Sequence, residues 1–200
     1  MKPKKLWFAA FILVAIAELF IPWQMISKQA GFADTGKEFK FKTDSKFKGR
    51  NNRTGASLQG KYVLLHFEQD EIRIKDRKEW AVIENAYIQL NNDSAGFAEI
   101  QSVTKVKPKN TTDWIRARVF VKWNDSTSLV IVYPFNKYFI EDTKHKSIDS
   151  VIKYGLNDSV STNYLLVKIK ENQFLSRDLI IDGISFKERI EATKKQGKIR

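Results

Sequence analysis

The side chains best suited to covalent chemistry in this sequence surround one histidine. His66 lies in an alternating segment and is followed closely by Glu68, Asp70 and Glu71. An imidazole beside carboxylates can act as a general base or hold a metal ion weakly. A strand histidine that simply satisfies its hydrogen bonds is the commoner case, so we predict no catalytic residue. An envelope hydrolase that uses His66 remains an alternative function.

A second local pair of carboxylates, Glu141 and Asp142, could share acid and base roles if their environments differed. Adjacent side chains usually point in different directions, which weakens this interpretation. The absence of cysteine excludes disulfides, thiolate metal sites and a cysteine nucleophile, and two histidines do not suffice for a multi-histidine metal centre. We therefore predict no metal and no cofactor.

Basic residues outnumber acidic ones, and the formal net charge is +12. Arg116, Arg118 and Lys122 alternate with apolar residues, which places them on one face of a predicted strand. A basic face near a membrane attracts anionic lipid head groups or an anionic surface polymer. The alternative is an ordinary solvated face of a sheet. Nucleic acid is not a predicted partner, because the sequence has no recognition-helix signature and no aromatic RNA-binding motif.

Residues 6–26 form an apolar run that follows a basic N-terminal flank, residues 1–5. At ~1.5 Å per residue, such a run is long enough for a helix to cross a ~30 Å hydrocarbon layer. Signal peptides have a shorter apolar core. We therefore predict a single, uncleaved transmembrane helix, with membrane lipid as one partner. The alternative is cleavage at residues 31–33, whose sequence GFA loosely resembles a small-x-small cleavage site. The basic flank favours a cytoplasmic N-terminus and an extracytoplasmic body, in an inner membrane facing the periplasm.

Two residues of this span are unusual for a lipid-facing helix. Glu18 places an acidic group near its middle, and Pro22 cannot donate a backbone hydrogen bond to the carbonyl of Glu18. Polar groups inside a membrane often contact another membrane helix. The alternative is a protonated carboxyl that reaches water or the interface.

Period-2 alternation dominates after residue 60 and predicts antiparallel strands. In residues 114–123, Ile115, Ala117 and Val119 share one face. Residues 86–90 and 165–170 alternate in the same way, whereas residues 62–67 and 129–133 are short apolar runs typical of buried strands. Residues 147–154 have apolar side chains at helical spacing, which predicts one short helix.

These patterns predict a mainly β protein. A sandwich or barrel-like antiparallel domain with one short helix is expected over residues 60–187, preceded by the transmembrane helix. Residues 27–59 are polar and are expected to form a linker and an irregular loop. Residues 188–200 are expected to be a disordered basic tail.

Residues 60–67 read GKYVLLHF and resemble the signature of the bacterial GDYXXLXY family. Gly60, Tyr62 and Leu65 match, whereas Lys61 replaces the aspartate and Phe67 replaces the final tyrosine. Because Lys61 has no carboxylate, no role of that aspartate is carried over. Three further segments occur in the family's order, namely FKFKT at 39–43, YFIE at 138–141 and LIIDG at 179–183.

The resemblance implies a membrane-anchored protein without an assigned reaction, often encoded beside a multi-pass membrane protein. It therefore implies a non-catalytic accessory or assembly partner of such a protein. Glu18 and Pro22 would dock within the bilayer, and a face near Tyr62 and 138–141 would dock outside it. The residues of this second face are Tyr138, Phe139 and Glu141. Tyr62 and Leu65 are expected to be core or strand-pairing residues, with Gly60 permitting the turn before them.

Overall fold

The computed structural model describes residues 18, 35–45, 56–59, 61–75, 77–80, 84–122, 125–140, 146–156 and 162–197. The chain divides into residues 1–36 and a body that begins at Lys37. Glu18 is helical and exposed, but Pro22 and the rest of the predicted span lie outside the described residues. Within the described part, no helix is long and apolar enough to cross a membrane.

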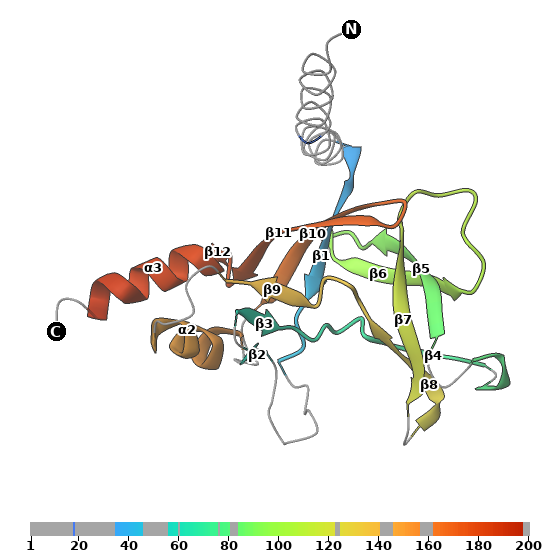
Figure 1. The fold of residues 1–200 in the computed structure, drawn as a ribbon, viewed down its shortest axis with the longest axis horizontal. Coiled ribbons are helices and arrows are strands. Elements are labelled where there is room, and N and C mark those ends of the chain that lie inside the picture. Colours follow the sequence, from blue (N-terminus) through green and yellow to red (C-terminus); the bar gives the residue numbers. More distant parts are fainter. Residues whose placement is uncertain are drawn as a thin grey trace, which may run out of the picture. The chain divides into compact units, whose positions relative to one another are not determined.

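The body is mainly β, as the alternation predicts, and its strands form three antiparallel sheets (Figure 1). The first sheet has the order β1-β10-β11-β12, with β1 Lys37–Lys42, β10 Asn163–Lys170, β11 Gln173–Ile181 and β12 Ile184–Ser185. The second has the order β2-β3-β9, with β2 Ser57–Gln59, β3 Tyr62–Leu64 and β9 Lys137–Phe139. The third has the order β4-β8-β7-β5-β6, with β4 Glu71–Arg73, β5 Glu84–Asn92, β6 Ala98–Thr104, β7 Trp114–Lys122 and β8 Asp125–Val132.

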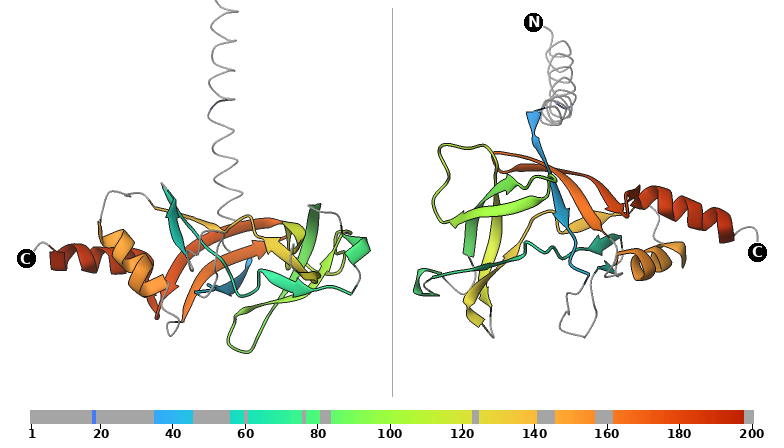
Figure 2. Two further views of the ribbon diagram at one scale, coloured as in Figure 1. Left: turned by 90° about the horizontal axis from the view of Figure 1, so that it is seen from below. Right: turned by 180° about the vertical axis from the view of Figure 1, so that it is seen from behind.

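Short bridges join these sheets into a nearly closed, barrel-like arrangement. Lys40 of β1 forms a parallel bridge with Phe97, just before β6, and Thr43 forms an antiparallel bridge with Phe67. The Leu65 N–H donates to the Asn136 carbonyl at 2.8 Å. The barrel-like form of the prediction is therefore the one observed, since strands of different sheets curve around one core (Figure 2).

The core is built from the inward-facing residues of the alternating strands. Ile115, Ala117 and Val119 of β7 are buried, and their neighbours Arg116 and Arg118 are exposed. The same pattern recurs in β10, where every second side chain from Asn163 to Ile169 is buried. This confirms the strand predictions for residues 114–122 and 165–170, with Trp123 outside the described part.

The predicted linker of residues 27–59 contains two strands, β1 and β2, which corrects that expectation. Phe39 and Phe41 of β1 are fully buried, while the lysines between them face outward. The period-2 pattern is present in this segment, but the lysines lower its mean hydropathy and give it the composition of a linker. The body therefore begins well before residue 60.

Two helices occur in the described body, where one was predicted. The expected helix is α2, Lys146–Val151, continued by a π-helical turn over Ile152–Leu156. The second is α3, Phe186–Gly197, so most of the predicted tail is helical. Phe186 and Ile190 are buried on one side of α3, four residues apart, and hold it against the body. Both helices lie at the end of the body away from β6 and β7 (Figure 1).

Candidate functional site

The strand that carries the family-like motif pairs with the second segment that the resemblance singled out. Tyr62 of β3 lies opposite Phe139 of β9, and Val63 lies opposite Tyr138. Leu65 and Phe67 are buried in the core, as expected for a structural motif. Gly60 lies outside the described residues.

Tyr62, Lys137 and Phe139 form a group that we call the aromatic edge, in which Tyr62 is half-buried and the other two are exposed. The rings of Tyr62 and Phe139 are 5.8 Å apart, and the Lys137 Nζ lies 4.9 Å from the Tyr62 ring centre. Phe139 is 68% exposed, which is unusual for a phenylalanine. β9 is also the last strand of its sheet, so the aromatic edge borders an edge strand.

Tyr138 faces the other way from the aromatic edge. It is buried, contacts the Phe186 ring in a T-shaped arrangement at 5.8 Å, and lies with its hydroxyl 3.5 Å from Asp178 Oδ1. Glu141 and Asp142 lie outside the described residues. Of the face predicted from 138–141, Phe139 alone among the described residues is available to a partner.

His66 lies in a cleft of about 500 Å³ on the outer side of β7 and β8. Its Nδ1 is 3.8 Å from Asp70 Oδ2, too long for a hydrogen bond. The carboxylate of Asp70 accepts a hydrogen bond from the Phe67 N–H at 2.9 Å. Asp44 lines the same cleft, brought there by its N–H, which donates to the His66 carbonyl at 2.7 Å.

Burial controls the protonation of this pair. It raises the pKa of Asp70 to about 7, although the hydrogen bond from the Phe67 N–H opposes this increase, and the charge of Asp44 adds a smaller increase. Burial also lowers the pKa of His66, against the charge of Asp44. Near neutral pH the imidazole is therefore neutral and Asp70 exchanges a proton.

This cleft can bind and release a proton, but its described lining offers no serine, threonine or cysteine nucleophile. Among the residues that the structure describes, no group of three His, Asp or Glu side chains could hold a metal ion. The sequence pointed to His66 and Asp70 but missed Asp44, which follows the unpredicted strand β1. The geometry therefore gives the hydrolase alternative a proton-exchanging pair and, among the described lining residues, no Ser, Thr or Cys that could form a covalent intermediate.

The three predicted basic residues do not share one environment. Arg116 and Arg118 are exposed on the outer face of β7, and neither forms an ion pair with a carboxylate of the described residues. Lys122 instead pairs with Glu71 of β4 at 2.6 Å, and this hydrogen bond lowers the pKa of Glu71. Of these three residues, the two arginines are the ones whose charge is available to bind an anionic ligand.

Comparison with known proteins adds no identification. No family model matches the chain, and searches of curated proteins and of solved structures give no match. The functional argument therefore depends on the geometry of the body.

Proposed function

We propose that this chain is a membrane-anchored, non-catalytic accessory subunit of a multi-pass membrane protein. Its body would lie outside the cytoplasm and bind an apolar extramembrane segment of the partner through the aromatic edge. The observation that carries the proposal is the exposure of Phe139 beside Tyr62, on the strand pair β3–β9.

Exposed aromatic rings are costly to leave in water and are enriched at protein interfaces. A phenylalanine and a tyrosine in contact provide a larger apolar surface than either ring alone, and the Lys137 ammonium lies over one of them. Such a pair is typical of the small group of residues that supplies most of the free energy of binding at an interface.

The membrane part of the proposal rests on the sequence. The apolar run 6–26 would hold the chain in the bilayer, and Glu18 with Pro22 would contact a helix of the same partner. Two separated contacts on one partner raise the effective concentration of each for the other. Loss of either contact should therefore weaken the complex strongly.

The proposal is tested by crosslinking the full-length chain in its own membrane, followed by purification in a mild detergent. We expect a multi-pass membrane protein to co-purify with the wild type, and to be reduced at least about tenfold by Phe139→Ser or by Glu18→Leu. The matched control is Tyr154→Ser, because Tyr154 is 69% exposed on the π-helical turn and lies on a different element.

Thermal unfolding of each variant should match the wild type, because Phe139 and Tyr154 are exposed. A partner that is retained by both Phe139→Ser and Glu18→Leu would contradict the proposal. The same conclusion would follow if no multi-pass protein co-purified with the wild type.

A further inference from the structure

The outer face of β7 continues into a second basic region that the sequence patterns did not indicate. Trp114, Arg116 and Arg118 alternate along this face, and the loop before β7 carries Lys107 and Lys109. We call Lys107, Lys109, Arg116 and Arg118 the basic face. At ~3.3 Å of rise per residue, the two arginines are spaced by about 7 Å along the strand.

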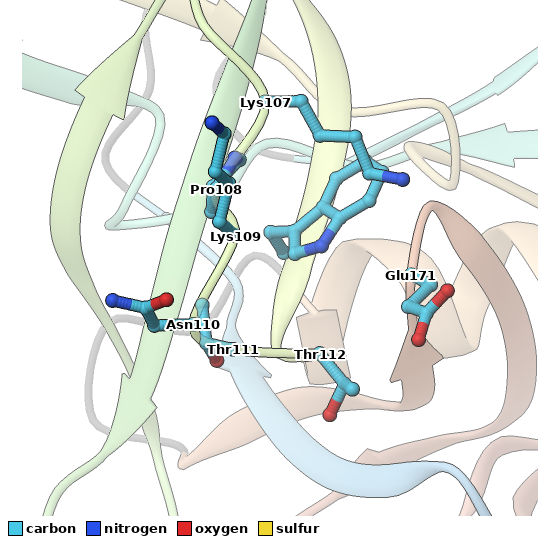
Figure 3. A pocket seen from close by; sticks show the side chains of 8 residues that line it. Lys107, Pro108, Lys109, Asn110, Thr111, Thr112 and Glu171 are labelled. Atoms are coloured by element: carbon cyan, nitrogen blue, oxygen red, sulfur yellow. The ribbon is translucent and has the colours of Figure 1, made fainter.

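The loop shapes a hollow of about 560 Å³ that is also lined by Trp114, the first residue of β7, two positions before Arg116 (Figure 3). Lys107 and Lys109 line this hollow, and the Lys107 Nζ lies 5.2 Å from the centre of the Trp114 ring. Thr111 and Thr112 also line it, which adds hydroxyl groups to the lining. Cationic and neutral donors are therefore combined in one recess.

The turn between β10 and β11 fixes the base of this hollow. The Glu171 N–H donates to the Thr112 carbonyl at 2.7 Å, and the Arg116 N–H donates to Asn172 Oδ1 at 2.8 Å. These bonds hold the loop and the start of β7 in one arrangement. A ligand would therefore meet a preformed surface, which reduces the ordering cost of binding.

The local charge is strongly positive even when the neighbouring carboxylates are counted. Glu171 is the acidic residue among the described residues that line the hollow. Asp113 is adjacent, but it pairs with Lys37 at 2.9 Å. The four cations of the basic face therefore exceed the available carboxylates, and an anion is the ligand that this charge selects.

We propose that the basic face binds a linear anionic polymer, whose negative groups repeat along its chain. Arginine guanidinium groups bind phosphate and carboxylate oxygens through paired hydrogen bonds. A polymer chain can enter the hollow, where Lys107, Thr111 and Thr112 would contact it, and then follow β7 past both arginines. This inference does not depend on the aromatic edge, which lies on another sheet.

The test uses the full-length chain in phosphatidylcholine nanodiscs. Long-chain polyphosphate and polygalacturonate are the two probes, since they distinguish phosphate from carboxylate as the recognised group. With four ionic contacts, affinity should fall about 50- to 150-fold between 50 and 200 mM salt. Vesicles rich in phosphatidylglycerol form the lipid arm and should bind more weakly than either polymer.

Arg116→Gln with Arg118→Gln should weaken polymer binding about tenfold or more at low salt and reduce the salt slope by between about one and two. Lys107→Gln with Lys109→Gln should act similarly. The matched control, Lys187→Gln with Lys195→Gln, removes the same charge from exposed positions of α3. Lys122→Gln should have little effect, because Lys122 pairs with Glu71.

Binding of either polymer with these responses would support the proposal. Vesicles that bind while both polymers do not would overturn it in favour of a lipid-facing surface. It would also be overturned by the absence of polymer binding, or by equal losses in the arginine and α3 variants. The proposed accessory function would survive each of these failures, because it is tested through Phe139 and Glu18.

Discussion

Asp70 carries its carboxyl group in a place that water reaches poorly. It lies at the end of a tight turn, where it accepts the Phe67 N–H and where its own N–H donates to the Phe67 carbonyl at 3.0 Å. The turn needs an acceptor at this position, but it does not need a charge. Burial makes ionisation of Asp70 unfavourable and raises its pKa to about 7.

Stability should consequently depend on pH through Asp70. The folded protein retains the proton up to about pH 7, whereas an unfolded chain releases it near 3.8. The stabilisation from the neutral acid is complete below the unfolded value and is lost as pH rises through about 7. Asp70→Asn keeps the acceptor without the charge. We expect its stability relative to wild type to rise by about 2–3 kcal/mol between about pH 5 and 8, measured by denaturant unfolding.

His66 contributes with the opposite sign, because its lowered pKa favours the neutral form in the folded state. Its contribution is present above the unfolded value of 6.5 and is lost as pH falls. Because His66 is present in both wild type and Asp70→Asn, its contribution cancels when their free energies of unfolding are subtracted. Glu68→Gln removes an exposed carboxyl from the same cleft and is the matched charge control for this comparison. Parallel profiles for Asp70→Asn would contradict the prediction.

At the scale of single elements, the β11–β12 hairpin explains the family-like segment at 179–183. Ile181 pairs with Ile184, so Asp182 and Gly183 form a two-residue turn. Both have positive φ, 48° and 78°, the conformation that Asp-Gly favours in such hairpins. Asp182 Oδ2 also accepts a hydrogen bond from Arg189 of α3 at 3.2 Å. The turn therefore sets the start of α3.

Gly183→Ala should destabilise the protein by about 1 kcal/mol, because alanine resists a positive φ. The space around Gly183 is open, so the added methyl group meets no neighbour and the cost is conformational. Gly183→Asn is the control, since asparagine adopts this conformation more readily and should cost less. Chemical denaturation measures both, and equal costs would show that packing, and not backbone conformation, governs this position.

Strand predictions succeeded where alternation coincided with apolar composition, as in β7 and β10. They failed for β1, where lysines occupy the outward positions beside Phe39 and Phe41. The tail was expected to be disordered because of its charge, yet Phe186 and Ile190 are enough to fix α3 to the body. In both cases a few buried apolar side chains hold a polar segment in a regular element. Their burial is visible only in the tertiary structure.

The candidate surfaces belong to the scale of the whole molecule, and they were predictable only in part. Tyr62 and Phe139 were both singled out by resemblance, but their contact depends on strand pairing between distant segments. The sequence grouped Lys122 with Arg116 and Arg118 on one strand face. Pairing of β4 with β8 brings Glu71 to Lys122 and removes it from that group. Long-range pairing of this kind has no local signal.

A cluster of aromatic side chains connects the three sheets. Phe41 of β1 lies at its centre, with ring centres 5.5 Å from Phe67, 5.2 Å from Tyr133 and 4.8 Å from Phe135. Phe67 follows the motif strand β3, and Tyr133 follows β8, so contacts from all three sheets meet at Phe41.

Removal of this ring should therefore weaken the whole body at once. Phe41 is fully buried, and Phe41→Ala should lower the free energy of unfolding by about 3–5 kcal/mol while leaving a single transition. Phe174→Ala is the control, because Phe174 is 40% exposed and its ring contacts the margin of the cluster at Phe135, so its loss should be smaller. Guanidinium unfolding followed by both fluorescence and circular dichroism distinguishes the outcomes. A core shared by the three sheets should make them unfold together. Two separate transitions in the Phe41→Ala protein would show that the sheets unfold independently and would contradict the prediction.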